Sequence, residues 1–408
     1  MEANTIVPAE VADIFRLYGQ QFRQQYKLPL RHLRAMNAIK NCRTRALGSH
    51  TDVCDKCGHT SVYYDSCRNR HCPKCQGLNQ TKWADKLSAN LLPVKYFHIC
   101  FTLPKQLNRL ILVNQECLYD ILFKAGSETI MELAKDPKHL GVETGLVAVL
   151  HTWGQNLMEH PHLHTIVPAG GWDEMTQYWK YSRKNFFIYV KILSRVFRGK
   201  FLALLKKAYK ENKLKFEGEI AQFKQAKKFN ELLRPLYDME WVVHSEPSQK
   251  NFTHVIEYLA RYSYRVAISN DRILGIANDR VFFKWKDNKD KKNKGKQKVM
   301  DLDAVEFIRR FMLHILPDGF CKIRYYGIFA SRNRTLKLEP IRKALDRKII
   351  KAKYAGLPWN EVLFLLTGVD PLKCPKCKDG RMIQAAHTSP PYAKLGRAPP
   401  INLTFSVL

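Results

Sequence analysis

The feature that most constrains the fold is a group of cysteines in the stretch CDKCGHTSVYYDSCRNRHCPKCQ. Cys54 and Cys57 form one Cys-x2-Cys pair, and Cys72 and Cys75 form a second pair shortly after it. A tight turn of this kind places two thiolates on one side of a loop, and two such turns can complete a tetrahedron around zinc. The spacing therefore predicts a zinc site made by these four residues. A site filled by four thiolates is structural, because it leaves no open position for catalysis.

More potential metal ligands lie close to these pairs and farther along the chain. Eleven cysteines, an odd number in a long chain, favour metal sites over a disulfide framework. Cys374 and Cys377 form a distant third pair, which is either an incomplete zinc ribbon, a site completed by His387, or no metal site. The residues near the first two pairs either form a second zinc site or are outer donors and packing residues: Cys42, His50, Cys67 and His71.

The charge of the chain points to a polyanionic partner. It has 68 lysines and arginines against 37 acidic residues, a formal net charge of +31. Such a surplus is typical of proteins that bind nucleic acid, although a merely soluble basic surface is the alternative. Within the cysteine region we expect Arg68, Arg70 and Lys74 to contact DNA. The apolar runs are too short for a membrane helix and the first residues do not resemble a signal peptide, so we expect a soluble cytoplasmic protein, associated with the nucleoid of a prokaryote.

The middle of the chain carries three histidines in the sequence HPHLH, at the entry to a predicted strand. Strand-like runs of apolar and β-branched residues cover 94–103, 145–153 and 163–168. Residues two apart on a strand point to the same face, so His162 and His164 present both rings on one side. Such a pair can bind one divalent ion, or it can be a chance pair with one buried histidine.

A later segment reads HVIEYLARYSY. Tyr258 and Tyr262 are four residues apart, so on a helix both phenols lie on one face. The pair is suited to nucleophilic chemistry, but it also fits an ordinary apolar stripe of a helix. Farther on, DNKDKKNKGKQ is expected to be the lysine-rich tip of a hairpin.

These motifs together resemble a known family. CDKCGHTSVYYDSCRNRHCPKC, HTWGQNLMEHPHLHTIVPAGG, YLARYSYRVAISN and FMLHILPDGFCKIRYYGIFA follow one another as in the rolling-circle transposases of the insertion sequence ninety-one family. The resemblance covers roughly residues 30 to 380 and includes the histidine and tyrosine motifs of the HUH endonucleases. It implies an α+β fold, with an HUH-endonuclease-like antiparallel sheet flanked by helices, a small amino-terminal zinc-binding domain and helical insertions.

The resemblance also implies residue roles. His162 and His164 would hold a catalytic Mg²⁺ or Mn²⁺, with Leu163 as the hydrophobic residue between them. Tyr258 and Tyr262 would be the nucleophiles, although one of the two is dispensable in some relatives. Several nearby residues qualify for other roles: Gln155 as a third metal ligand, with His151, His160 and Glu159 as alternatives; Arg261 and Arg265 as DNA contacts; and Tyr264 as a further phenol.

The function implied is the nicking and rejoining of single-stranded or melted DNA at insertion-sequence ends, and its joining to target DNA, through a 5′-phosphotyrosine. No G-x4-GK[ST] phosphate loop is present, consistent with strand joining without ATP. The alternatives are a rolling-circle replication initiator or relaxase, and a noncatalytic zinc-dependent DNA-binding regulator. The expected domains are a zinc-binding domain at 1–92, a catalytic domain at 93–278 with a helical insertion at about 175–238, an α/β extension at 279–370 with the basic hairpin, and a Cys-x2-Cys segment with a loose tail at 371–408.

Overall fold

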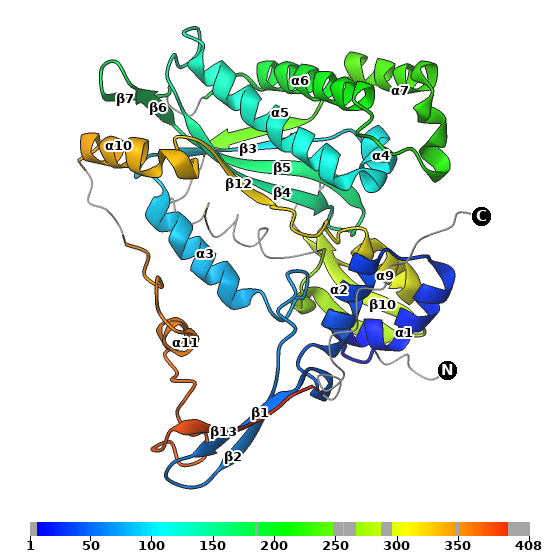
Figure 1. Cartoon of the computed structure of the whole chain (residues 1–408), viewed down its shortest axis with the longest axis vertical. Helices are drawn as coiled ribbons and strands as arrows, with labels where there is room; N and C mark the ends of the chain where they lie inside the picture. The colour runs from blue at the N-terminus through cyan, green and yellow to red at the C-terminus, as the bar shows by residue number, and fades with distance from the viewer. Residues whose placement is uncertain are drawn as a thin grey trace.

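The computed structural model describes residues 6–183, 187–247, 256, 267–286, 296–346 and 351–390. Its centre is a five-stranded sheet in the order β12-β4-β5-β3-β8, in which all neighbouring strands are antiparallel (Figure 1). The strands are β3 (Tyr96–Thr102), β4 (Gly145–Trp153), β5 (Glu159–Pro168), β8 (Val243–Pro247) and β12 (Ile323–Gly327).

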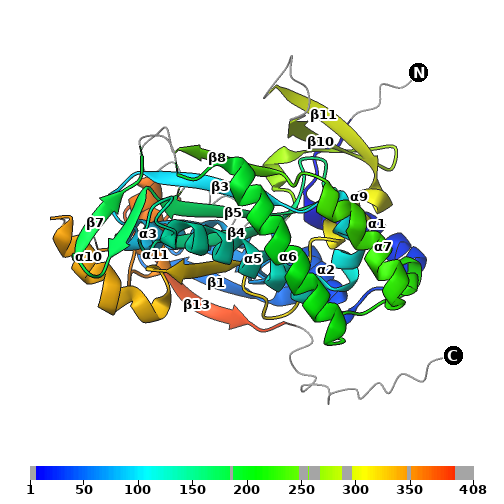
Figure 2. The same ribbon diagram turned by 90° about the horizontal axis from the view of Figure 1, so that it is seen from above.

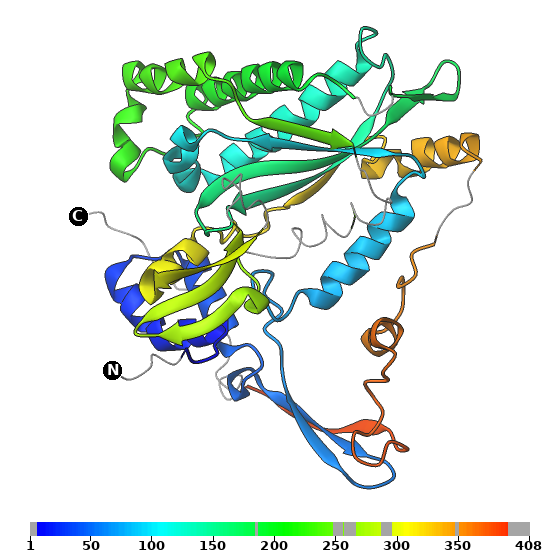
Figure 3. The same ribbon diagram turned by 180° about the vertical axis from the view of Figure 1, so that it is seen from behind.

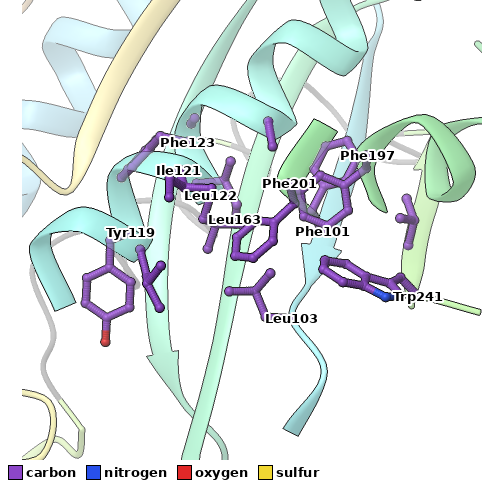
Figure 4. Packing of buried hydrophobic residues seen from close by; sticks show 14 of the residues in the cluster. Phe101, Leu103, Tyr119, Ile121, Leu122, Phe123, Leu163, Phe197, Phe201 and Trp241 are labelled. Atoms are coloured by element: carbon purple, nitrogen blue, oxygen red, sulfur yellow. The ribbon is translucent and has the colours of Figure 1, made fainter. Parts of the chain in front are cut away.

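One face of this sheet is covered by helices. Phe101 and Leu163 point from the sheet into this layer, where Phe101 packs on Phe197 with ring centroids 4.7 Å apart (Figure 4). The helix nearest the sheet comes close because Gly126 has no side chain: a Cβ there would lie 2.9 Å from Cδ2 of Leu163. The covering helices are α4 (Asn108–Val113), α5 (Gln115–Lys135), α6 (Val190–Lys210) and α7 (Ala226–Asp238), with the 3-10 turns η2 (Lys105–Leu107) and η3 (Gly218–Lys224) (Figure 2).

The opposite face of the sheet carries both apolar residues and the histidines. Val147, Val149 and Ile166 belong to a second buried cluster on this side. The cluster also includes residues from α3 (Gly77–Asn90) and α10 (Glu339–Ala344), and the π-helical turn η6 (Arg334–Leu338) precedes α10. This face therefore changes along its length from a packed apolar end to a histidine-rich end.

Segments far apart in the sequence form a third cluster beside the sheet. Phe15 packs edge-on against Phe311 with ring centroids 5.3 Å apart, and Val7 pairs with Ile276. The elements are α1 (Val11–Gln25), α2 (Leu30–Asn41), α9 (Ala304–Met312) and the sheet β11-β10-β9, made of β9 (Ile273–Ala277), β10 (Arg280–Lys286) and β11 (Gln297–Asp303), with η4 (Asn270–Arg272) before β9. Figure 3 shows this unit next to the base of a long hairpin.

That hairpin extends away from the rest of the molecule. Strands β1 (Ser49–Cys54) and β2 (Thr60–Tyr64) form it, and β13 (Met382–Thr388) pairs with β1 along its other edge (Figure 1). The turn η1 (Arg45–Leu47) precedes β1, and α11 (Trp359–Thr367) leads toward β13. The three-stranded sheet β13-β1-β2 thus combines the beginning and the end of the chain.

The predicted α+β fold with an antiparallel sheet and flanking helices is confirmed. The predicted strands at 94–103, 145–153 and 163–168 correspond to β3, β4 and β5. The segment 175–238 is not wholly helical, because β6 (Gly170–Asp173) and β7 (Tyr178–Tyr181) form a hairpin before α6. Strand β12 lies within the expected 279–370 extension, so this extension supplies an edge strand of the central sheet. The turn η5 (Ser331–Asn333) follows β12.

Among the helices that the structure describes, none is both long and apolar enough to cross a membrane.

Candidate metal and catalytic site

The histidine-rich end of the sheet is built by strand register. His162 lies opposite His151 of β4, and His164 lies opposite Val149. On the other side of β5, His164 lies opposite Cys100 of β3. Since facing residues of neighbouring strands point the same way, these rings and this thiol share one face. His162 and His164 therefore point to the same face of the sheet, as predicted from the two-residue period of a strand. Leu163 is buried on the other face.

The rings contact one another directly. Nδ1 of His151 lies 2.9 Å from Nε2 of His162, and Nε2 of His98 lies 2.9 Å from Nδ1 of His164. His98 in turn lies 3.4 Å from a carboxylate oxygen of Glu246 on β8. The result is a continuous row of imidazoles across three strands that ends at a carboxylate.

Burial keeps these imidazoles neutral. It lowers the pKa of His162 to about 3, and it lowers the pKa values of His151 and His164 well below the usual range, with neighbouring histidines adding to the effect. A neutral imidazole has one ring nitrogen with a lone pair, which is the form that binds metals. Nδ1 of His162 is hydrogen-bonded to the carbonyl oxygen of His160, which leaves Nε2 facing the other rings.

The donor set fits a divalent cation. Ligand atoms of Cys100, His162 and His164 all lie within 4.8 Å of one another. Two nitrogens bound at right angles to an ion at about 2.1 Å would be about 3.0 Å apart. The 2.9 Å between His151 and His162 is close to that value. On this one distance His151 is a candidate third nitrogen donor beside His162, although it is not part of the group formed by Cys100, His162 and His164.

The residue favoured as third ligand from the sequence lies elsewhere on the loop. Gln155 is in the turn between β4 and β5, past the His151–His162 pair, where its backbone oxygen accepts a 2.6 Å hydrogen bond from Nη2 of Arg272. His160 and Glu159 stand at the start of β5, and His160 is exposed. The role of Gln155 as a ligand stays a prediction.

The turn that leads into β5 is hydrogen-bonded by side chains from elsewhere in the chain. Arg272, Arg310 and His314 donate hydrogen bonds to the carbonyl oxygens of its three consecutive residues Gln155, Asn156 and Leu157. Leu157 is buried with φ +63°, a backbone conformation that a branched side chain rarely adopts. These three donors fix the strained turn and hence the start of β5.

His314 gives this turn a predictable response to pH. Its Nε2 donates to Leu157 and its Nδ1 accepts from the hydroxyl of Thr152, so the ring is neutral, and burial lowers its pKa to about 4. The unfolded chain therefore binds a proton first as pH falls below about 6.5, and stability is lost between that pH and about 4. We expect His314 to cost roughly 2 kcal/mol of unfolding free energy between pH 7 and pH 5.

The matched variant His314→Gln can make both hydrogen bonds and does not titrate. Its urea midpoint should fall less than that of the wild type between pH 7 and pH 5. Equal falls for both proteins would contradict the assignment.

The predicted nucleophiles lie outside the described residues, as do Arg261 and Arg265. One nearby residue is described: Ile256, two positions before Tyr258, is 2% exposed and belongs to the same buried cluster as Val149 and Ile166. The chain thus passes over the histidine-bearing face of the sheet just before Tyr258.

Eight of the eleven cysteines form two separate groups of four. Cys42, Cys67, Cys72 and Cys75 form the first group, with Sγ of Cys75 lying 3.4 Å from that of Cys42 and 3.6 Å from that of Cys67. Thiolates bound tetrahedrally to zinc at about 2.3 Å are about 3.8 Å apart, and disulfide sulfurs are about 2.05 Å apart. The first group therefore fits zinc.

The predicted pairing of Cys54 and Cys57 with Cys72 and Cys75 is corrected by this geometry. Six-residue β1 separates the two pairs by roughly 20 Å, since a strand rises about 3.3 Å per residue. Cys54 and Cys57 instead lie at the tip of the hairpin, in a second group with Cys374 and Cys377.

His50 and His71, also proposed as ligands, are in neither cysteine group. His50 lies 3.6 Å from Asp65 and stacks on Tyr63. Nε2 of His71 accepts a hydrogen bond from the backbone N–H of Leu316. Both histidines therefore have partners other than the cysteines.

The expected DNA contacts near the first group differ in their surroundings. Arg68 is exposed and follows Cys67 with φ +52°. Arg70 donates a 2.8 Å hydrogen bond to the carbonyl oxygen of Phe320, and Lys74 forms an ion pair with Glu10. Arg70 and Lys74 therefore attach the cysteine region to the rest of the molecule.

Comparisons with known proteins assign the cysteine region and the segment that carries His162 and His164 to two different family models. Residues 14–103 match a family model described as "Transposase zinc-binding domain", and residues 145–336 match one described as "Putative transposase". The chain is 43% identical over 377 residues to "Putative transposase y4qJ" of Sinorhizobium fredii, covering 92% of this chain and 94% of that protein. The chain belongs to the insertion sequence ninety-one family of transposases.

A more distant relative is consistent with the family. The chain is 27% identical over 354 residues to "Transposase for insertion sequence element IS801" of Pseudomonas savastanoi pv. phaseolicola, covering 85% of this chain and 82% of that protein. No solved structure matches. As a transposase the chain is a DNA-processing enzyme that binds DNA, and its zinc-binding domain confirms structural zinc.

The match at 14–103 includes all four cysteines of the first group. Sequence reasoning missed that Cys42 and Cys67 belong with Cys72 and Cys75. One signal in the sequence could have shown this: Cys374 and Cys377 form a third Cys-x2-Cys pair, which needs another such pair to complete a zinc site.

Proposed function

We propose that this transposase nicks and rejoins single-stranded DNA at the ends of its insertion sequence, with Tyr258 and Tyr262 as nucleophiles and a 5′-phosphotyrosine as the intermediate. The observation that carries the proposal is the row of buried, neutral imidazoles on one face of the central sheet, in which His162 and His164 are two residues apart on β5. A purely structural role would not require three contacting histidines to be kept neutral at a sheet surface.

The metal ligands we assign are His162, His164 and His151. All three offer imidazole nitrogen, a ligand of transition-metal ions, so Mn²⁺ fits the site better than Mg²⁺ does, whereas the sulfur of Cys100 suits softer ions. When bound, such an ion would offset charge on the scissile phosphate. The imidazoles themselves need no large movement, because strand pairing already holds them in register.

The tyrosines would carry out a transesterification. The phenol oxygen forms a bond to phosphorus, the bond from phosphorus to the 3′ oxygen breaks, and the phenol proton leaves as the 3′ oxygen becomes a hydroxyl. The phosphodiester energy is kept in the phosphotyrosine, so the reverse attack by a 3′-hydroxyl joins strands without ATP. A free tyrosine is only about 0.1% ionised at pH 7, so the phenol needs a charge-stabilising partner such as the histidine site.

Two observations support the proposal, one on the position of the tyrosines and one on the attraction of DNA. Ile256 is buried against the histidine-bearing face of the sheet, so the chain reaches that face just before Tyr258. The net charge of +31 supplies a surface on which a DNA backbone is attracted. A single-stranded substrate is proposed because the scissile backbone must approach side chains that are largely buried in the sheet.

The experiment is a cleavage assay with a labelled single strand from the end of the insertion sequence and Mn²⁺. We expect an adduct that survives SDS, and mass spectrometry of the digested adduct should find the nucleotide on Tyr258 or Tyr262. His162→Ala/His164→Ala should lower adduct formation by at least about a hundredfold, with DNA binding retained. Cys100→Ser is the matched control from the same face and should keep most of the activity. An adduct on another residue, or a fully active histidine variant, would refute the proposal.

A further inference from the structure

We propose that Cys54, Cys57, Cys374 and Cys377 form a second zinc site, one that joins the beginning of the chain to its end. The matched zinc-binding segment stops at residue 103, far short of Cys374. Sγ of Cys54 lies 3.7 Å from that of Cys377, although the two residues are 323 positions apart. Sγ of Cys57 and Cys374 are also 3.7 Å apart. Both distances fit the edge of a zinc–thiolate tetrahedron, about 3.8 Å.

The two cysteine turns have the same backbone structure. The N–H of Gly58 donates to the carbonyl oxygen of Cys54 at 3.1 Å, and the N–H of Lys378 donates to that of Cys374 at 3.1 Å. The residue after each second cysteine is left-handed, with φ +67° at Gly58 and +60° at Lys378. Glycine adopts this conformation readily and lysine does not, so the second turn is held in shape against its own preference.

Backbone amides point at sulfur atoms in both turns. The N–H of Cys57 lies 3.5 Å from Sγ of Cys54, and the N–H of Gly380 lies 3.3 Å from Sγ of Cys377. Such donors favour a thiolate over a thiol, and thiolates are the ligands of zinc. A Cβ on Gly380 would lie 2.3 Å from Sγ of Cys54, so the C-terminal segment approaches the first turn as closely as backbone permits.

The segment that carries Cys374 and Cys377 has little apolar packing against the hairpin, to which it is otherwise joined by strand pairing and by hydrogen bonds between Asp55 and Arg381. The only buried residue of α11 is Val362, and the buried cluster at the hairpin tip consists of Cys54, Cys374 and Met382. The strand β13 has one buried residue, Met382, although it pairs with β1 over six residues. A three-stranded sheet needs a hydrophobic face or a packed helix to be stable, and β13 brings only Met382 to such a face, so β13-β1-β2 depends on an attachment that apolar packing does not supply. A shared metal ion would be that attachment.

The two cysteine groups differ in exposure. Cys42 and Cys72 are each 1% exposed and belong to the buried cluster of α1, α2 and α9. In the second group Cys54 and Cys374 are also buried, but Cys57 is exposed at the hairpin tip, and the first group has no exposed member. A chelator should therefore remove zinc from the second group first and release the C-terminal segment while the rest stays folded.

The first test is the zinc content of the full-length protein by elemental mass spectrometry. We expect two zinc ions per chain in the wild type and one in Cys374→Ser/Cys377→Ser. The matched control Cys117→Ser/Cys321→Ser removes two cysteines that belong to neither group and should keep two. One zinc in the wild type, or two in the Cys374 and Cys377 variant, would overturn the inference.

The second test follows backbone amide hydrogen exchange in β13 and in α5. In the Cys374 and Cys377 variant, and in wild type given limiting chelator, exchange in β13 should rise by at least about a hundredfold, whereas α5 should not change. Equal protection of β13 with and without metal would overturn the inference even if zinc binds. Neither measurement involves DNA cleavage, so its outcome is independent of the proposed function.

Discussion

The double variant Tyr258→Phe/Tyr262→Phe should form no covalent DNA adduct, a loss of at least about a thousandfold relative to the wild type. Phenylalanine keeps the ring and removes only the oxygen that would attack phosphorus. The histidine site and the basic surface are unchanged, so affinity for a single strand should stay within about threefold. The measurement is an SDS gel of labelled strand with Mn²⁺, alongside a binding titration at the same salt concentration.

The single variants and a neighbouring phenol refine this result. If each tyrosine serves one strand, Tyr258→Phe and Tyr262→Phe should each keep one cleavage and lose the coupled strand transfer. Tyr264→Phe is the matched control in the same segment and should retain adduct formation. A double variant with wild-type adduct, or loss of adduct in Tyr264→Phe alone, would exclude the assignment of the pair.

Cys72→Ser should cause the largest loss of stability, roughly 5 kcal/mol or more, because structural zinc sites contribute about 10 kcal/mol of binding free energy to folding. Cys72 is buried among the helices of the amino-terminal unit, so losing the ion leaves three thiolates without charge balance inside a core. We expect poor soluble yield, zinc loss from the first group and rapid proteolysis within α1 and α2.

Two comparisons make this second prediction specific. Cys117→Ser, outside both cysteine groups, should behave as wild type. Cys377→Ser should lose zinc and β13 protection without unfolding α1 and α2, because its group lies at the hairpin tip. Equal damage from Cys72→Ser and Cys377→Ser would mean that the two groups fold as one unit.

The parts of the fold that could be predicted are those whose signal is local. The runs at 94–103, 145–153 and 163–168 are buried strands, and a buried strand is recognised from its own apolar and β-branched residues. The common face of His162 and His164 follows from the two-residue period of a strand and needs no knowledge of the neighbouring strands.

The parts that could not be predicted depend on partners far away in sequence. A Cys-x2-Cys turn shows that two thiolates face one way, but not which other pair completes the tetrahedron. The length of β1 decides this, because it places Cys54 at the opposite end of the hairpin from Cys42. The contact between His151 and His162 likewise could not be predicted, since it depends on the register between β4 and β5.

Because distant segments pair with each other, some parts of this protein can fold only after the last part of the chain has been synthesised. The hairpin β1-β2 leaves the ribosome early, yet its third strand and half of its tip cysteines come from residues 374–388. The central sheet likewise waits for β12 to cover the edge of β4. Until the last part of the chain emerges, an exposed strand edge and two unpaired thiols remain at the hairpin tip. A copy of the gene that ends prematurely would therefore yield a chain with an open sheet edge and reactive thiols, a form that cellular proteases would be expected to remove.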